Sequence, residues 1–532
     1  MELSTEQIKP CLVQTVQGFT VSYKDKLLYS KYNPQKAITQ LIQNLTLQPQ
    51  TLILCVSPVL SYGIKELAQK LPQDCLMLGC EYDDELYDFM LKNVQAEQGF
   101  TFLTRDELVN LGPLLVKRNV TLKSGFTLPQ PGTFRRIIKI DFSAGAQFGG
   151  DIYNRVIENA TNALMTFWAN RVTLVKFGRK YCTNFFKNLT VYPKTVPIQK
   201  YFGSVEKPII VFGAGESLEE GVKHIKSQTG GADSFFILCA DTALQPLVAS
   251  GIIPDGVFIE EAQNVINKCF IGTQAYPTHV FAGLSCVHSI TRYFKPEQIS
   301  FFTTEFVQAG FLDRFEKAGI LPPKNEPFGS VGITAFYYAT LFCRDASVPV
   351  QTFGLDFAYS AGRTHTKGTM ADNARFMNSC RTKNDANYAA AFLPPAFKCG
   401  QVYTTPILQR YAGLFEALRQ AQGPQTMSQG PQVQSGLPEA KRGVPEPAEG
   451  AIGKDPHTIL STERTALLEL KALLTGEKTL PPEQQQQEIT KLICEREYLY
   501  LHFPDGHKFA WTQSFLNRVR VEVEYYLKIL KW

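Results

Sequence analysis

Six short apolar runs between residue 206 and about residue 420 constrain the fold of this chain more than any other feature of its sequence. They are PIIVFG, FFILCA, GVFIE, HVFAG, ISFFTTE and VQTFGLDF, and helix-like segments separate them. Continuous apolar runs that alternate with helices are typical of a mostly parallel sheet with helices on both faces. We therefore predict a Rossmann-like domain over residues 206–420. Its chemistry is expected in the loops that follow the carboxyl ends of the strands.

The 532-residue length indicates further domains around this one. Residues 1–150 alternate strand-like runs with helical ones, which predicts an N-terminal α/β domain. Apolar side chains at helical spacing predict a helical connector over residues 151–205. The Gly-, Pro- and Gln-rich stretch 421–458 predicts a flexible linker, and leucine spacing over 459–532 predicts a helical C-terminal domain. The expected fold class is α/β, with a mostly parallel Rossmann-like central sheet domain between a smaller α/β domain and a helical one.

Within the N-terminal domain, the run CLMLGC leads into Glu81, about where a ribose-binding acid falls in a dinucleotide fold. The preceding loop carries only Gly63 where a dinucleotide-binding loop would have several glycines. These residues favour a Rossmann-like module without a ligand, and they leave the function of this domain open.

The bulk composition excludes several classes of protein. A hydrophobic content of 44% with 19% charged residues is typical of a soluble globular chain. The net charge of +5 is small and spread along the sequence, which argues against nucleic acid as a ligand. Twelve scattered cysteines without C-x-x-C spacing favour buried reduced thiols. No secretory signal and no apolar stretch long enough to span a bilayer are visible, so we expect a cytoplasmic protein with no membrane span.

The loop GAGESL follows the first apolar run of the central domain. Gly213 and Gly215 let the backbone turn sharply and approach a ligand, and Ser217 could cap the next helix or bind a phosphate oxygen. A structural tight turn explains the two glycines equally well. Glu216 adds a carboxylate, which would repel a phosphate by roughly 1 kcal/mol in water at about 4 Å. The loop is therefore a nucleotide site, an altered one or only a turn.

Two further loops have the same ambiguity. Asp241 ends the run FFILCA and Thr242 follows it, so the acid could bind a ribose or a base edge, or only cap its own helix. Gly329 and Ser330 precede an apolar helix whose free amides would suit a carboxylate or phosphate. Close helix packing is the alternative explanation for this glycine.

An acidic group surrounds the third apolar run, GVFIE. Carboxylates can hold a divalent cation through their oxygen atoms. The run has no D-x-D spacing, so we predict no firm metal site here and name Asp255 and Glu261 as the residues that would form one.

The fourth loop collects the most reactive set of side chains. Asp356 ends an apolar run, and Tyr359, Arg363, His365 and Lys367 follow within eleven residues. His365 is a candidate general base, Tyr359 supplies a phenol, and the two cations could bind a phosphate. This set suits a reaction in which a hydroxyl is deprotonated while a phosphate leaves.

With these four loops in order, the chain resembles the motility-accessory-factor (Maf) family of bacterial flagellin glycosyltransferases. That family shares its core domain with the archaeal 6-hydroxymethylpterin diphosphokinase (MptE-like) family, and more distantly resembles bacterial sialyltransferases that use CMP-activated sugars. The resemblance is carried by GAGESL, ADTALQPLVASGIIPD, GSVGITAFYYA and GLDFAYSAGRTH. KYNPQKAITQLI and FWANRVTLVKF are also similar, so it covers roughly residues 25–415. In this chain Glu216 stands where the family usually has proline.

The resemblance implies transfer of a nonulosonic acid of the pseudaminic or legionaminic type from its CMP form to Ser or Thr hydroxyls of flagellin, for flagellar assembly and motility. Asp241 would contact the cytidine or sugar, and Ser330 the sugar carboxylate. Tyr359 would assist the departing phosphate and His365 would be the base. The phosphate would lie along Gly213, Gly215 and Ser217. The expected binding residues are Gly213, Ala214, Gly215, Ser217, Asp241, Thr242, Gly329, Ser330 and Arg363. The expected catalytic residues are His365, Tyr359 and Asp356.

Two other functions remain open at this point. The first is a pyrophosphokinase-like enzyme that uses ATP and Mg²⁺, and the second is an altered family member that binds a filament protein without catalysis. The expected partners are a nucleotide sugar and flagellin or another bacterial filament protein. No firmly bound cofactor is predicted, and Mg²⁺ is left as an option.

Overall fold

The computed structural model describes residues 9–94, 100–307, 309–421, 426–428, 456–505 and 508–531. The chain forms two compact units, Met1–Val175 and Lys176–Trp532, and each is described by itself. The boundary lies within the 42-residue helix α6 (Gly150–Val191), which covers most of the predicted helical connector. Most of the predicted linker over 421–458 lies outside the described residues.

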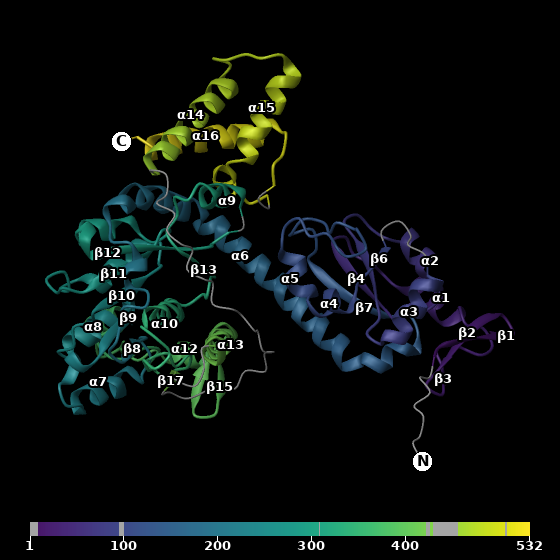
Figure 1. Cartoon of the computed structure of the whole chain (residues 1–532), viewed down its shortest axis with the longest axis horizontal. Coiled ribbons are helices and arrows are strands. Elements are labelled where there is room, and N and C mark those ends of the chain that lie inside the picture. Colours follow the sequence, from purple (N-terminus) through teal and green to yellow (C-terminus); the bar gives the residue numbers. More distant parts are fainter. Residues whose placement is uncertain are drawn as a thin grey trace. The chain divides into compact units, whose positions relative to one another are not determined.

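The first unit contains an antiparallel sheet and a parallel sheet (Figure 1). The antiparallel sheet has the order β1–β2–β3 and adds to the predicted α/β pattern; its strands are Cys11–Thr15, Gly18–Tyr23 and Lys26–Leu27. The parallel sheet has the order β6–β5–β4–β7; these strands are β4 (Thr51–Val56), β5 (Leu76–Cys80), β6 (Phe100–Phe102) and β7 (Arg136–Asp141). Every residue of β4 and β5 is buried, because helices cover both faces of such a sheet. The helices of this unit, besides the start of α6, are α1 (Lys36–Asn44), α2 (Ile64–Gln69), α3 (Asp84–Asn93), α4 (Arg105–Val109) and α5 (Leu111–Val116).

The second unit is built on an eight-stranded parallel sheet with the order β13–β12–β11–β10–β9–β8–β14–β17. All six apolar runs predicted as strands are confirmed: β8 (Ile209–Phe212), β9 (Phe236–Ala240), β10 (Gly256–Ile259), β11 (His279–Gly283), β12 (Ile299–Thr304) and β14 (Val350–Phe353). The short strands β13 (Lys324–Asn325) and β17 (Thr426–Ser428) extend the two edges. Successive strands from β8 to β13 run in one direction across the sheet, whereas β14 lies on the other side of β8. The strand order therefore reverses at the β8–β14 pair, where ligands bind in open sheets of this kind.

Helices flank the large sheet (Figure 1). Helix α10 (Val331–Phe342) is apolar all round because it packs inside the unit, where Tyr338 and Phe342 contact Phe258 of β10. After β14 the chain forms two short helices, a β15–β16 hairpin and α13. The elements are α7 (Leu218–Ser227), α8 (Asp241–Ala249), α9 (Gly310–Lys317), α10 (Val331–Phe342), α11 (Met370–Met377), α12 (Tyr388–Phe392), β15 (Phe397–Cys399), β16 (Val402–Thr404) and α13 (Pro406–Ala421).

The C-terminal region is helical, as predicted, and consists of α14 (Pro456–Thr475), α15 (Pro482–Cys494) and α16 (Gln513–Ile529). Its Glu497 accepts the amides of Gly310 at 2.8 Å and Phe311 at 3.1 Å, at the N-terminus of α9. The ring of Tyr526 in α16 lies 5.7 Å from that of Phe186 in α6. The last helix is therefore packed against its neighbours. Among the described residues, no helix is long and apolar enough to cross a bilayer.

Candidate functional site

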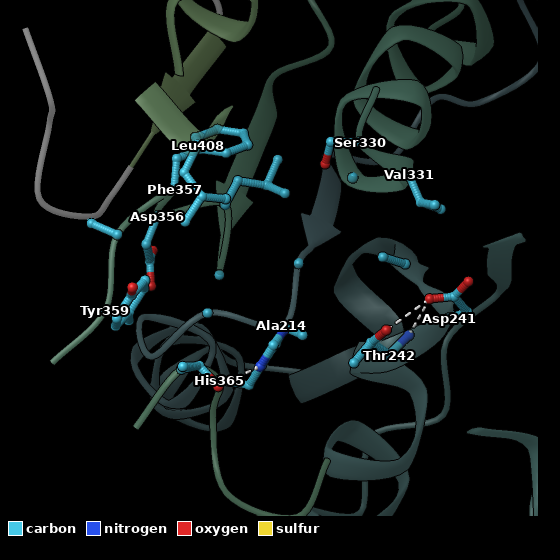
Figure 2. A pocket seen from close by; sticks show the side chains of 18 residues that line it. Ala214, Asp241, Thr242, Ser330, Val331, Asp356, Phe357, Tyr359, His365 and Leu408 are labelled. Carbon is cyan, nitrogen blue, oxygen red and sulfur yellow. Dashed lines mark hydrogen bonds between the residues drawn. The ribbon is translucent and has the colours of Figure 1, made fainter. Parts of the chain in front are cut away.

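A cavity of about 250 Å³ opens at the carboxyl ends of β8, β9 and β14, at the point where the strand order reverses (Figure 2). All four loops singled out in the sequence contribute to its wall. Asp241 and Thr242 lie across the cavity from Asp356 and Tyr359 (Figure 2). Its lining is Gly213, Ala214, Gly215, Ala240, Asp241, Thr242, Ser330, Val331, Gly332, Gly354, Leu355, Asp356, Phe357, Ala358, Tyr359, Thr364, His365 and Leu408.

The glycines of GAGESL have a packing role as well as a place in the cavity wall. A Cβ on Gly213 would overlap the carbonyl of Gly354, and a Cβ on Gly354 would overlap the carbonyl of Gly213. Gly354 also has a φ of +71°, which disfavours any other residue. A Cβ on Gly215 would overlap the carboxylate of Asp356. The tight turn and the candidate site are therefore the same feature, because the two loops meet backbone to backbone beside the cavity.

Ser217 connects these two loops and does not line the cavity. Its amide donates to Asp356 Oδ2 at 3.0 Å, and its hydroxyl donates to Asp356 Oδ1. The hydroxyl oxygen also accepts the amide of Gly354 at 2.6 Å. Burial raises the pKa of Asp356, and the hydrogen bonds from Ser217 partly offset that shift. Ser217 thus holds a candidate catalytic carboxylate in place, where the sequence suggested a phosphate contact.

Glu216 points away from the cavity. Its carboxylate accepts the amide of Ser360 at 2.7 Å and the hydroxyl of Ser360 at 3.1 Å. Glu219, in the first turn of α7, accepts Arg363 at 2.7 Å. Arg363 was expected to bind the ligand, but it pairs with Glu219 and is absent from the cavity wall. The acids at the start of α7 therefore hold the loop that carries Tyr359 and His365.

Tyr359 lines the cavity with its ring, while its hydroxyl donates to the carbonyl of Ala390 in α12 at 2.6 Å. Burial raises the pKa of this phenol, so it stays protonated at neutral pH. Its proton is directed at the backbone of α12, and assistance to a leaving phosphate would require the hydroxyl to change its partner.

His365 lies in the wall of the cavity, and its side chain is exposed to solvent. Its Nδ1 lies 3.1 Å from the hydroxyl of Thr364, and no described residue binds Nε2. Burial by the surrounding chain, and to a smaller extent the charge of Arg375, lower the pKa of His365. The imidazole is therefore neutral at pH 7, which is the form that can accept a proton.

The surroundings of Asp241 raise its pKa strongly. The pKa of Asp241 is raised to about 7, mainly by burial; the hydrogen bonds from Thr242 oppose this shift, and the charges of Glu261 and Glu260 add to it. Its Oδ1 accepts the amide and the hydroxyl of Thr242 at 2.6 and 2.9 Å, whereas Oδ2 is buried without a hydrogen-bond partner among the described residues. An unpartnered oxygen in a cavity wall can bind a ligand amino or hydroxyl group.

Helix α10 presents its N-terminus to the cavity. Ser330 is its N-cap, but the side chain caps no amide. Val331 and Gly332 follow in the first turn, where amides have no partner within the helix, and all three residues line the cavity. Gly329 does not line it: its φ is +76°, and a Cβ there would lie 2.5 Å from the ring of Tyr411. The Ser330 hydroxyl and the amides of this first turn are groups that can bind an anion.

Asp255 and Glu261 cannot share a metal ion. Asp255 precedes β10 and accepts the amide of Ile237 at 2.7 Å, whereas Glu261 follows the other end of this four-residue strand, about 13 Å long. Glu261 accepts the amide of Gln263 at 2.8 Å. Within the described ranges there is no group of three His, Cys, Asp or Glu side chains suited to a metal ion.

Several lining residues carry no signal in the sequence. Leu408 comes from α13, beyond the β15–β16 hairpin, and no local pattern places it at the cavity. Phe357 has a φ of 50°, which is unusual for an aromatic residue and could not be inferred from its neighbours. Thr364, next to the predicted His365, could have been found as its hydroxyl partner.

The corresponding acid of the first unit is enclosed. Glu81 follows β5, and its Oε1 accepts the amides of Tyr82 and Asp83 at 2.8 and 3.0 Å and the hydroxyl of Tyr153 at 2.8 Å. Burial raises its pKa, and these hydrogen bonds lower it in part. The prediction of a Rossmann-like module whose acid binds no ribose therefore remains, since Glu81 binds its own loop and α6.

Comparisons with known proteins agree with this architecture. Residues 183–362 match the family model described as 6-hydroxymethylpterin diphosphokinase MptE-like, a range that contains β8 to β14 and ends before His365. An uncharacterized protein of Treponema pallidum (strain Nichols) is 29% identical over 564 residues, covering 98% of this chain and 95% of that protein.

The fold is also similar to that of a solved glycosyltransferase. The structure of MAf glycosyltransferase from Magnetospirillum magneticum AMB-1 matches with a TM-score of 0.54 over 99% of this chain and 92% of that chain, at 11% identity. The chain therefore contains an MptE-like domain and has, over its full length, a Maf-like glycosyltransferase fold.

Proposed function

We propose that this chain is a cytoplasmic glycosyltransferase that moves a nonulosonic acid from a CMP-sugar to Ser or Thr hydroxyls of flagellin or another bacterial filament protein. One observation carries the proposal: the uncapped N-terminus of α10, with Ser330, lies in the wall of the same cavity as His365. An anion site and a base in one cavity are what transfer of an acidic sugar requires. The Maf-like fold supports the assignment.

The charges of the cavity wall favour a donor with few phosphates. No Lys or Arg is found among the described residues that line it, and Asp241 adds a carboxyl. The amides of α10 and the Ser330 hydroxyl can bind one phosphate or one carboxylate. Asp241 Oδ2 has no partner and can accept from the amino group of a cytosine or from a sugar hydroxyl. A nucleoside monophosphate ester fits this wall better than a triphosphate.

The reaction needs one proton acceptor on the protein. The acceptor hydroxyl oxygen bonds to the anomeric carbon, the bond from that carbon to the phosphate oxygen breaks, and its electron pair leaves with CMP. The hydroxyl proton passes to His365, which the lowered pKa keeps neutral. Because positive charge develops on the sugar ring, the protein can act by binding the leaving phosphate and activating the nucleophile.

A pyrophosphokinase is the second candidate, because the matching family model is described by that activity. It would need ATP with Mg²⁺, and the phosphates of the nucleotide would then supply most of the metal ligands. The hypothesis of a non-catalytic filament-binding protein was based on Glu216. That residue binds Ser360 and does not face the cavity, so the hypothesis loses its main support.

Titration calorimetry of the full chain with CMP, CDP and ATP, each with and without Mg²⁺, tests the proposal. We expect CMP and CDP to bind without metal, Ser330→Ala to weaken binding about tenfold, and His365→Ala to bind normally but transfer no sugar. Ser227→Ala, on an exposed hydroxyl at the end of α7, is the matched control. Binding of ATP alone, and only with Mg²⁺, would support the pyrophosphokinase. A folded protein that binds no nucleotide would contradict both.

A further inference from the structure

Residues 370–407 expose an unusual amount of apolar surface beside the cavity. This segment, termed the apron, contains α11, α12 and the β15–β16 hairpin. Seven of its large apolar side chains are 39–83% exposed: Phe376, Met377, Tyr388, Phe392, Leu393, Phe397 and Ile407. Exposed apolar side chains gathered in one segment mark an interaction site more often than a free surface.

The helices of the apron have almost no core of their own. No residue of α11 is buried, and Ala391 is the one buried residue of α12. Helices of this length are marginal in water without a packed face. A partner that covers these side chains would supply the missing packing.

The apron is attached to the cavity wall. Tyr359 lines the cavity and donates to Ala390 of the apron at 2.6 Å. Leu408, the first residue after the apron, also lines the cavity. Arg375 of α11 lies close enough to His365 to influence its titration. A polypeptide bound on the apron would therefore lie at the mouth of the cavity, beside the candidate base.

The charges of the apron are mainly positive. Asp372 is engaged by the amide of Gly368 at 2.9 Å, and Asp385 is the other acid of the segment. Four basic side chains form no ion pair with any described residue: Arg375, Arg381, Lys383 and Lys398. A partner that complements this surface would present apolar side chains flanked by acidic ones.

We propose that the apron is the docking surface for the acceptor polypeptide, which contributes apolar and acidic side chains and places its hydroxyl beside His365. This inference rests on the proposed function, because it assumes a protein acceptor. A symmetric pair of chains would oppose the basic groups of one apron to those of the other, which disfavours a second copy as the occupant. Residues 429–455 of this chain offer few large apolar side chains and nearly balanced charges.

The test separates docking from chemistry. The double variant Phe376→Ser, Phe392→Ser removes two side chains that are more than half exposed, and it also removes the ring contacts of Phe392 with Tyr388 and Tyr403. The fold and CMP binding should persist, and both are measured first. The acceptor in this test is purified flagellin monomer. We expect the variant to bind flagellin at least tenfold more weakly than the unaltered protein, and its KM for flagellin to rise accordingly. Its rate of CMP-sugar hydrolysis by water should stay within twofold of the unaltered rate. Arg381→Glu with Lys383→Glu should act in the same direction. Val521→Ser, at an exposed apolar side chain of α16, is the matched control and should change nothing.

Several outcomes would overturn the inference. Flagellin binding unchanged in both double variants would do so, as would a dimer that dissociates in these variants while flagellin binding persists. Replacement of residues 429–455 by a Gly-Ser linker should leave hydrogen exchange of α11 and α12 unaltered; faster exchange there would identify that segment as the occupant. Failure of the proposed function would be recognised separately, because the unaltered protein would then not bind CMP. Binding of flagellin to the apron can be measured whether or not sugar is transferred.

Discussion

In each of the two parallel sheets, one strand is followed directly by an acid: Glu81 after β5 and Asp241 after β9. The surroundings of these two acids differ. In the first unit, one carboxylate oxygen of Glu81 accepts hydrogen bonds from two backbone amides and from the hydroxyl of Tyr153. Asp241 in the second unit is bound on one oxygen by Thr242 alone. The second oxygen of each acid is buried without a described partner, but Asp241 lines the cavity. An acid after a strand is thus a structural anchor in one sheet and part of a cavity wall in the other.

Neighbouring side chains account for the contrast. In the first unit, Tyr153 from α6 fills the space at the sheet edge. In the second unit the loops after β8 and β14 meet backbone to backbone at Gly213 and Gly354, and Asp241 lines the cavity beside them. The position of an acid at a strand end therefore does not identify a site. Whether such an acid lines a cavity depends on the residues that pack around it.

The largest expected effect would come from His365. His365→Gln should lower kcat for sugar transfer by about 10²- to 10⁴-fold, because the acceptor hydroxyl loses its base. Affinity for CMP should stay within about threefold. Glu81→Gln is the control in the first unit and should leave kcat unchanged. A loss of kcat in Glu81→Gln, with stability intact, would mean that the enclosed edge takes part in the reaction.

A smaller effect is expected from Glu81→Ala. The amide of Asp83 and the hydroxyl of Tyr153 would lose their buried acceptor, which costs about 4 kcal/mol of unfolding free energy. Urea unfolding followed by circular dichroism measures it. Glu81→Gln keeps an acceptor oxygen and should lose much less. If Glu81→Ala is no less stable than the unaltered chain, Glu81 is not an anchor.

Asp241→Asn should show an effect that depends on pH. Burial raises the pKa of Asp241 to about 7, so between pH about 4 and 7 the folded protein keeps a proton that the unfolded chain releases. The unfolding free energy therefore falls as pH rises through this range. Asn removes the cost, so the variant should be more stable than the unaltered chain at pH 8, by on the order of 4 kcal/mol, and equal to it near pH 4. Thermal unfolding at the two pH values measures the difference. A constant offset would show that Asp241 does not titrate in the fold.

The smallest effect is expected from Glu216→Gln. Its side chain faces Ser360, and an amide oxygen can still accept the hydrogen bonds of that residue. Affinity for CMP should change by no more than about twofold in calorimetry. A tenfold gain would mean that the carboxylate acts on the ligand and that the cavity is less isolated from α7 than the contacts indicate.

The sequence contained enough to predict the large sheet, because each of its six long strands is a continuous apolar run between turn residues. Nine of the twelve residues expected from the sequence to bind or react line the cavity. They were predictable because the loops after parallel strands lie at one edge of the sheet. Ser217, Gly329 and Arg363 were expected there and have other partners. Their partners lie far along the chain, and such hydrogen bonds leave no local pattern.

The direction in which a side chain points could not be predicted from the local sequence either. Whether Glu216 faced a ligand or the protein depended on Ser360, 144 residues away. Leu408 reaches the cavity only because the chain returns after the hairpin to start α13. Residue type and spacing could predict the loops, but the pairing between loops required the folded chain.

The pairing of β8 with β14 also has a consequence for synthesis of the protein. Ser217 and Asp356, which hydrogen-bond to each other, are 139 residues apart. At about 5–20 residues per second, a ribosome needs roughly 7–28 s to reach the second from the first. During that interval β8 is an apolar strand with one open edge, the kind of edge that pairs with other chains. A chain terminated before residue 350 would lack β14, so β8 would stay at the edge of the sheet, and the cavity would lose the wall that residues 354–365 supply.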